Sequence, residues 1–267
     1  MRSVANRIVL AAVAATLAVA AGGCGKSSSP TSPPPAMSQA NADDIAIQTA
    51  SSVQVANLDL VAGASGSGSA LVSRPGATGS SAQWDTTFSV GSLTFEATRE
   101  FFDAGDNLLP GYGPTAVRMA WTSRVFGTAM WPRDTVTVGH SASADFRGIE
   151  SSADTLLVDG AALDTLASSF RSYDGTQTRH FYWNSSLTAA GLRYLKSTLG
   201  RDAWPLSGTV TLVVRADRLR SNDRADVEAH LNATVVVTFN GTSQPEIVVN
   251  GVWHYRWNPG TGIVTRV

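Results

Sequence analysis

Over the last two thirds of the chain, hydrophobic and polar residues alternate with a period of two. Every odd position from residue 227 to residue 239 is apolar, while the even positions carry mostly Glu, His, Asn and Thr. Successive side chains of a strand point to opposite faces, so this run predicts a long strand with one buried and one solvated face. Similar alternation occurs over residues 117–125, 136–146 and 210–214.

Turn signals separate these runs. Asp174-Gly175 and Asn240-Gly241 are typical hairpin dipeptides, and further turn signals lie at residues 103–107, 222–223, 250–251 and 259–262. About ten strands without long intervening helices predict a mainly β fold over residues 83–267, an antiparallel meander forming a barrel, half-barrel or sandwich. Residues 189–199 stay ambiguous, because their leucines suit a helix whereas Gly191 and Thr198 disfavour one.

Residues 41–60 have the spacing of one short helix. Asn41 is the expected N-cap, and Asp43 and Asp44 in the first turn would suit the positive end of the helix dipole. The apolar face is mild, with Ile47 and Val55 lying off it. We expect the helix to pack on the β-domain, and the alternative is an unattached amphipathic helix. The Gly/Ser-rich composition of residues 61–82 predicts a flexible segment.

The first residues have the three parts of a secretory signal. Arg2 and Arg7 precede an apolar run from residue 8 to residue 21, which ends in Gly22 and Gly23. This run is shorter than the about 20 residues that a membrane-spanning helix needs. We therefore expect residues 1–23 to be removed as a signal peptide.

Residues 21–24, Ala-Gly-Gly-Cys, resemble the lipobox of bacterial lipoproteins. The resemblance implies a lipid on Cys24, and Gly25 in place of an Asp implies the outer membrane of the cell envelope. Ala21 departs from the usual Leu, and the alternative is an ordinary signal peptide with an incidental Cys. The Ser/Pro-rich residues 24–40 would form an extended tether to the membrane.

The β-rich part of the chain also carries turn-and-strand motifs at residues 102–107 (FDAGDN), 204–209 (WPLSGT) and 237–242 (VTFNGT). In these motifs it resembles β-rich lipoproteins of bacteria. The resemblance implies a fold and a location without implying an activity.

Composition excludes several classes of protein. A single Cys rules out a disulfide framework and a Cys-rich metal site. A formal net charge of −1 gives no electrostatic basis for binding nucleic acid. Only 15 % of the residues are charged, which is low for a globular protein and fits a β-domain whose turns and wet faces carry Ser, Thr, Gly and Asn.

Catalytic and metal-binding motifs are not recognisable in the sequence. It contains no Gly-x-Ser-x-Gly motif, and its four His residues lack metal-ligand spacing, so we expect no metal and no cofactor. Residues 103–107 superficially suggest a calcium loop, but they lack the acidic series of an EF-hand, and a hairpin turn explains them better.

Two polar residues interrupt apolar faces. His140 and Arg99 each fall on the side of a predicted strand that is otherwise hydrophobic. A buried imidazole or guanidinium needs a partner. Either residue could line a ligand cavity; the alternative is a satisfied core His and an Arg that reaches solvent.

Trp253, Tyr255 and Trp257 lie on one face of one predicted strand. A two-residue turn at Asn250-Gly251 would expose them as a platform for a flat ligand such as a sugar ring. A three-residue loop would instead pair Val249 with Trp253 and place the row in the core, the interpretation we favour.

Three functions fit these features. The first is a non-enzymatic, lipid-anchored β-domain that binds a glycan, lipid or protein ligand. The second is a lipid carrier with an open barrel and residues 41–60 as its lid, which is similar in broad design to outer-membrane lipoprotein-localisation factors. The third is a hydrolase of envelope polysaccharide, which would need paired carboxylates such as Glu96, Glu100 and Asp145.

Overall fold

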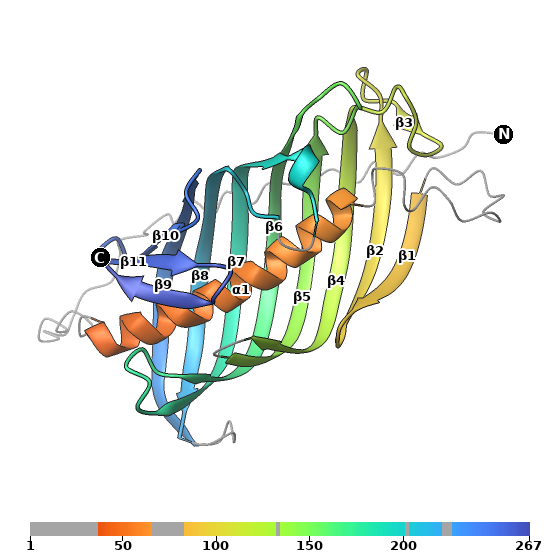
Figure 1. The fold of residues 1–267 in the computed structure, drawn as a ribbon. Coiled ribbons are helices and arrows are strands. Elements are labelled where there is room, and N and C mark those ends of the chain that lie inside the picture. The colour runs from red at the N-terminus through yellow and green to blue at the C-terminus, as the bar shows by residue number, and fades with distance from the viewer. Residues whose placement is uncertain (1–36, 66–82, 132–133, 201–202, 221–225) are drawn as a thin grey trace, which may run out of the picture. The chain divides into compact units, whose positions relative to one another are not determined.

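The computed structural model describes residues 37–65, 83–131, 134–200, 203–220 and 226–267. These residues form one long helix and one antiparallel sheet (Figure 1). The helix is α1, Gln39–Ser65, and a short 3₁₀ helix, η1, covers Lys196–Thr198. The strands are β1 (Gln83–Val90), β2 (Leu93–Phe102), β3 (Leu108–Leu109), β4 (Arg118–Trp131), β5 (Asp134–Arg147), β6 (Thr155–Arg171), β7 (Thr178–Leu195), β8 (Ser207–Leu219), β9 (Val227–Asn240), β10 (Glu246–Val249), β11 (Trp253–Asn258) and β12 (Ile263–Arg266).

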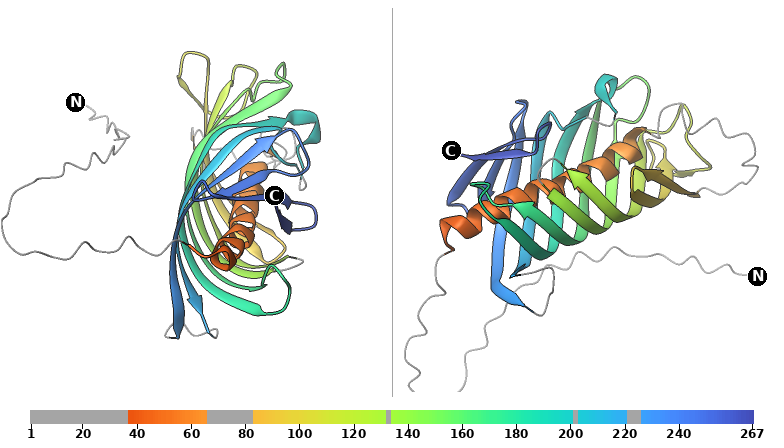
Figure 2. Two further views of the ribbon diagram at one scale, coloured as in Figure 1. Left: turned by 90° about the vertical axis from the view of Figure 1, so that its left-hand side faces the viewer. Right: turned by 60° about the horizontal axis from the view of Figure 1, so that its bottom comes forward.

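The sheet is a meander in which neighbours along the chain are neighbours in space. Its order is β1-β2-β4-β5-β6-β7-β8-β9-β10-β11-β12, and the short β3 pairs with β2. Among the described strands β1 and β12 form the two edges, so the sheet is open and curved, which corresponds most closely to the half-barrel (Figure 2). The predicted mainly β, antiparallel fold with one N-terminal helix is confirmed.

The sheet curves around α1, which lies along its concave face (Figures 1 and 2). Ile47 and Val55, which the sequence placed off the packed face, are 4 % and 0 % exposed. The helix packs on the sheet as predicted, and these two residues are buried as well, because a helix enclosed in a trough contacts protein on several sides.

The bounds of the helix also differ from the prediction. The helix begins before Asn41, and the Asn41 N–H donates to Ser38 Oγ at 3.3 Å, so Ser38 rather than Asn41 is the cap. Residues 39–40 of the predicted tether and 61–65 of the predicted flexible segment are helical. Residues 37–38 of the predicted tether precede the helix, whereas residues 24–36 and 66–82 and the predicted signal peptide lie outside the described residues.

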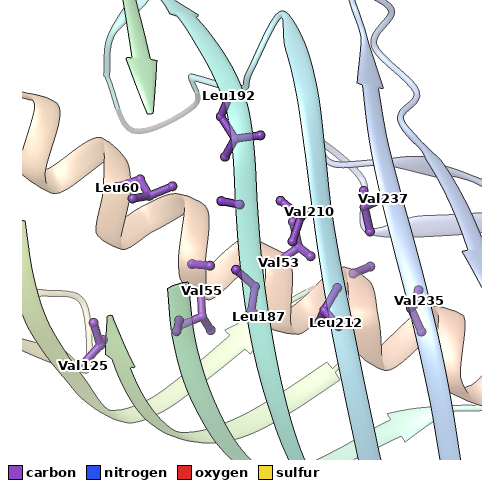
Figure 3. Close-up of a cluster of buried hydrophobic side chains, with 14 of the residues drawn as sticks. Val53, Val55, Leu60, Val125, Leu187, Leu192, Val210, Leu212, Val235 and Val237 are labelled. Carbon is purple, nitrogen blue, oxygen red and sulfur yellow. The ribbon is translucent and has the colours of Figure 1, made fainter. Parts of the chain in front are cut away.

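Aliphatic side chains fill the space between α1 and the strands (Figure 3). Val53, Val55 and Leu60 of the helix meet a layer of branched side chains from β4 and β7–β9. The odd positions 231–239 of β9 are buried, as their alternation predicts. Burial of this apolar surface is the main favourable contribution to the packing of α1. The labelled sheet residues are Val125, Leu187, Leu192, Val210, Leu212, Val235 and Val237.

Most predicted turns are confirmed. Chain reversals occur at residues 103–107, 174–175, 240–241, 250–252 and 259–262, whereas 222–223 lies outside the described residues. The ambiguous residues 189–199 continue β7 to Leu195 and end in η1. Gly191 has a φ of 60° at a register shift between Ala190 and Arg193, which interrupts the strand without ending it.

Candidate functional site

Polar side chains of α1 are buried along much of its length. A buried polar group is costly unless it is hydrogen-bonded, so each needs a partner on the sheet. The concave face supplies many of these partners from β4 to β7, β11 and β12. The buried polar residues of the helix are Asp43, Asp44, Gln48, Thr49, Ser51, Ser52, Asn57 and Asp59.

His140 on β5 is at the centre of this polar layer. Its Nδ1 is 2.5 Å from Asp164 Oδ1 on β6, and its Nε2 is 3.6 Å from Asp59 Oδ2 on α1. All three residues are at most 3 % exposed. The imidazole thus connects the helix to two adjacent strands, and the sequence prediction that a buried His140 needs a partner is confirmed.

Serine hydroxyls surround the two carboxylates. Ser52 Oγ donates to Asp164 Oδ2 at 2.5 Å, and Ser123 Oγ donates to Asp59 Oδ2 at 2.6 Å. We refer to Ser52, Asp59, Ser123, His140 and Asp164 as the histidine cluster. Both serines donate to carboxylates rather than to the imidazole, so the arrangement is not that of a nucleophilic triad. Burial also keeps substrate away from it.

The charges of Asp59 and Asp164 in the histidine cluster are partly compensated by His140. Burial alone would lower the pKa of His140, but hydrogen bonds and opposite charge from Asp164 and Asp59 outweigh it and raise this pKa to about 9. His140 is therefore protonated at neutral pH and offsets part of the carboxylate charge. A cavity of about 20 Å³ beside His140 and Asp59 has room for one water molecule.

Ionic contacts also hold the N-terminal half of α1. Asp43 accepts from Tyr255 Oη at 2.9 Å and from Arg266 Nε at 2.8 Å. Asp44 lies 3.7 Å from Arg179 Nε and 3.7 Å from Arg218 Nη1. Burial nevertheless raises the pKa of Asp44 to about 6, although the two arginines oppose that shift.

Asp134 at the start of β5 contributes another helix contact. It accepts from Ser51 Oγ at 2.6 Å. Burial raises the pKa of Asp134 to about 7, and the hydrogen bonds from Ser51 and the Thr135 backbone only partly counteract it.

Arg99 is buried on the same concave face as His140, with 1 % of its surface exposed. Its guanidinium lies 4.9 Å from the centre of the Trp121 ring, a cation–π contact. Burial lowers the pKa of Arg99 to about 10. Trp121 in turn donates from Nε1 to Asp59 Oδ2 at 3.2 Å, so Arg99 is linked to His140 through Trp121 and Asp59.

The aromatic row of β11 faces inward. Val249 pairs with Trp253 across a three-residue loop, as the favoured core interpretation requires. Tyr255 and Trp257 are 1 % and 0 % exposed, and Trp253 is half-buried. The core interpretation is confirmed, so this row forms no exposed platform for a ligand.

An open pocket of about 520 Å³ lies beside the C-terminal half of α1. Its volume is within the range of about 300–1,000 Å³ that is typical of small-molecule sites. Four segments far apart in the sequence meet there: the helix, residues 204–205, the end of β9 with the following loop, and the turn after β11. The described residues that line it are Gln54, Asn57, Leu58, Trp204, Pro205, Phe239, Thr242, Ser243, Pro245, Asn258, Pro259 and Gly260.

Trp204 is the largest side chain of this pocket, and its neighbours fix its position. Its ring packs against that of Trp257 in a T-shaped arrangement at a centroid distance of 4.9 Å, and lies nearly parallel to the ring of Phe239 at 6.5 Å. Sequence reasoning missed Trp204 as a site residue, since it appeared only within a turn-and-strand motif. Trp204 is identified as a pocket residue by its partial exposure, which depends on tertiary packing.

The carboxylates considered for hydrolysis lie on the other face of the sheet. Glu100 and Asp145 both pair with Ala120 of the intervening β4, which places them two strand spacings, about 10 Å, apart. They alternate with buried residues and therefore point to the convex face. Asp145 accepts from Arg118 Nη1 at 2.8 Å, and Glu96 pairs with Arg124.

His230, His254 and the 103–107 loop have local partners. His230 lies 2.7 Å from Asp217, and His254 lies 2.9 Å from Glu246. Asp103 accepts from the backbone N–H of Gly105 at 2.8 Å, which stabilises the predicted turn. Within the described ranges, no cluster of three or more His, Cys, Asp or Glu side chains suits a metal ion.

The described part of the chain contains no helix long and apolar enough to span a membrane. Comparison with protein-family models, curated proteins and solved structures gives no match to the chain.

Proposed function

We propose that this protein is a lipid-anchored lipoprotein of the bacterial cell envelope whose β-domain binds a small ligand without catalysis. The observation that carries the binding function is the 520 Å³ pocket beside α1. It combines the aromatic ring of Trp204 with amide and hydroxyl groups, the usual composition of a ligand site.

The separation of the pocket from the ionisable groups supports binding rather than catalysis. The described residues that line the pocket include no Asp, Glu, His, Lys or Arg. General acid–base catalysis needs a titratable group within hydrogen-bond reach of the substrate. The histidine cluster has such groups, but it is enclosed between α1 and the sheet.

The alternative functions require a different arrangement. A lipid carrier would need an apolar cavity under its lid, and α1 fills the concave face with buried side chains. A polysaccharide hydrolase would need facing carboxylates in a groove, whereas Glu100 and Asp145 lie on the convex face. The geometry therefore favours the pocket as the binding site.

A fragment screen tests the binding function. The detergent-solubilised full chain is screened by ligand-observed NMR against a chemically diverse library, in parallel with the Trp204→Ala and Gln54→Leu variants. Fragments whose binding is weakened in both variants are expected. A screen in which no fragment depends on either residue would refute the proposed binding function.

The anchor is inferred from Cys24 and the residues around it. The Cys24→Ala variant is expected to lose lipid labelling and to shift from the membrane fraction to the soluble fraction. In density-gradient separation the unaltered protein is expected with the outer membrane. Unchanged labelling and fractionation of the Cys24→Ala variant would contradict the anchor while leaving the binding function standing.

A further inference from the structure

We propose that the pocket binds a neutral saccharide of one or two rings, with one ring stacked on Trp204. This inference rests on the proposed binding function and names its ligand class. Three properties of the pocket support it: the absence of charge from its described lining, a fixed aromatic ring, and polar groups that are free to bind.

The lining selects against charged ligands. Its described side chains are aromatic, aliphatic, amide or hydroxyl. An ionised carboxylate or phosphate that entered the pocket would lose hydration without gaining an opposite charge. A saccharide without carboxyl or phosphate groups avoids this cost.

Trp204 provides a rigid surface for stacking. Trp257 contacts its ring at an interplanar angle of 87°, and Phe239 lies beside it at 23°. These contacts hold the indole in place before a ligand arrives, so little side-chain entropy is lost on binding. The C–H groups on one side of a pyranose ring form a flat apolar patch that complements such an aromatic face.

The polar groups of the pocket divide into occupied and available ones. Asn57 is occupied, because its Nδ2 donates to the Ala203 carbonyl at 2.9 Å and its Oδ1 accepts from Tyr194 Oη at 2.9 Å. Within the described part of the chain, the amide of Gln54 and the hydroxyl of Ser243 have no hydrogen-bond partner.

Asn258 adds a further available donor. Its Oδ1 accepts from the Gly260 N–H at 3.0 Å and from the Thr261 N–H at 3.2 Å, which directs the side chain without using Nδ2. Together with Gln54 and Ser243, it offers donors and acceptors around the ring of Trp204. Sugar hydroxyls both donate and accept and therefore match this mixed set.

A proline-rich peptide fits the pocket less well. Such peptides dock on grooves lined by several exposed aromatic rings. Here Trp204 is half-buried and Phe239 is 4 % exposed, so a single ring offers a surface. Binding of a proline-rich peptide is therefore the competing outcome of the binding test.

The test uses the detergent-solubilised full chain and a panel of defined probes. The neutral probes are glucose, galactose, N-acetylglucosamine, maltose, cellobiose and chitobiose. Glucuronic acid and a hexaproline peptide represent the charged and peptide classes. Binding is measured by saturation-transfer NMR and by titration of tryptophan fluorescence. At least one neutral saccharide is expected to bind, with glucuronic acid at least tenfold weaker.

Variants assign the binding to the pocket. Trp204→Ala is expected to weaken saccharide binding at least tenfold, and Gln54→Leu about threefold to tenfold. Gln54 is half-buried on the helix, and its side chain has no hydrogen-bond partner among the described residues, so this variant stays informative if Trp204→Ala is unstable. Trp131→Ala removes a half-buried Trp outside the pocket lining and is expected to bind normally.

The outcomes separate the ligand class from the binding function. Binding of hexaproline or glucuronic acid alone, lost on Trp204→Ala, would overturn the saccharide class and leave the binding function intact. If no panel member binds but the fragment screen gives ligands that depend on Trp204, the saccharide class is likewise overturned and the binding function stands. If neither panel nor screen gives a ligand that depends on Trp204 or Gln54, both proposals fail.

Discussion

Helix α1 contributes to two polar regions that differ in access and in charge. Ser52 and Asp59 are two helical turns apart on one face and belong to the enclosed, ionised histidine cluster. Gln54 and Leu58 lie on the opposite face and line the open, neutral pocket. One helix thus presents polar groups to the sheet on one side and to the pocket on the other.

The difference separates the buried charges of this fold from the proposed binding site. The cluster contains ionisable groups, and these groups contact other protein groups. The pocket has weaker polar groups that remain accessible. We therefore expect substitutions in the cluster to change stability and substitutions in the pocket to change binding.

The largest effect is expected from His140→Ala. Removing the imidazole leaves Asp59 and Asp164 buried without their cation, which should lower the free energy of unfolding by about 3–5 kcal/mol. His254→Ala is the matched control, because His254 pairs with Glu246 while 46 % of its side chain is exposed. That variant should lose at most about 1 kcal/mol. Denaturant unfolding measures both, and equal losses would contradict the structural role of the cluster.

An intermediate effect is expected from pH. Asp134 has a pKa of about 7 in the folded protein against an ordinary value of 3.8, so the folded state binds more protons between these values. Stability therefore falls as pH rises from 4 to 7. The pKa of His140 is raised from 6.5 to about 9, so its contribution is complete below pH 6.5 and is lost as pH rises through 9.

Both shifts act in the same direction. These two shifts should lower the free energy of unfolding by roughly 3 kcal/mol between pH 5 and pH 7, measured by denaturant unfolding at several pH values. Asp134→Asn should reduce the change below pH 7, where Asp44 with its pKa of about 6 and His140 still contribute, and should retain the change above it. Stability that increases with pH would contradict both assignments.

The smallest expected loss of stability is compared between two glutamines of α1. Gln48 is fully buried and accepts from Ser168 Oγ at 2.5 Å, whereas Gln54 lines the pocket. Gln48→Ala should cost about 2–3 kcal/mol, because it leaves a cavity and an unpaired hydroxyl. Gln54→Ala should change stability by at most about 0.5 kcal/mol. A reversed order in thermal and denaturant unfolding would show that the two faces of the helix have been misassigned.

The strands could be predicted because their information is local. Alternation in β9 and the loop after Val249 depend on neighbouring residues, and both agree with the structure. The buried polar face of α1 could not be predicted in the same way. Its partners are distant in sequence, as in the bonds from Ser51 to Asp134 across 83 residues and from Ser52 to Asp164 across 112.

The pocket was hidden from sequence analysis for a similar reason. Trp204 and Gln54 come from segments with no shared local pattern, and only the curvature of the sheet brings them together. His140 is the exception, because one polar residue on an apolar face already indicates a buried partner. The sequence could show that a partner was needed, but not that Asp59 and Asp164 supply it.

The contacts of Asp43 connect the start of α1 to the last two described strands. Asp43 lies near the start of α1, yet its hydrogen bonds come from Tyr255 and Arg266, 212 and 223 residues later. The meander can form between neighbouring strands, but the start of the helix gains these two hydrogen-bond partners only when β11 and β12 are in place. A chain in which β11 and β12 have not yet joined the sheet therefore lacks these two partners of the Asp43 carboxylate. The hydrogen bonds of Asp43 are therefore complete only when β11 and β12 have joined the sheet.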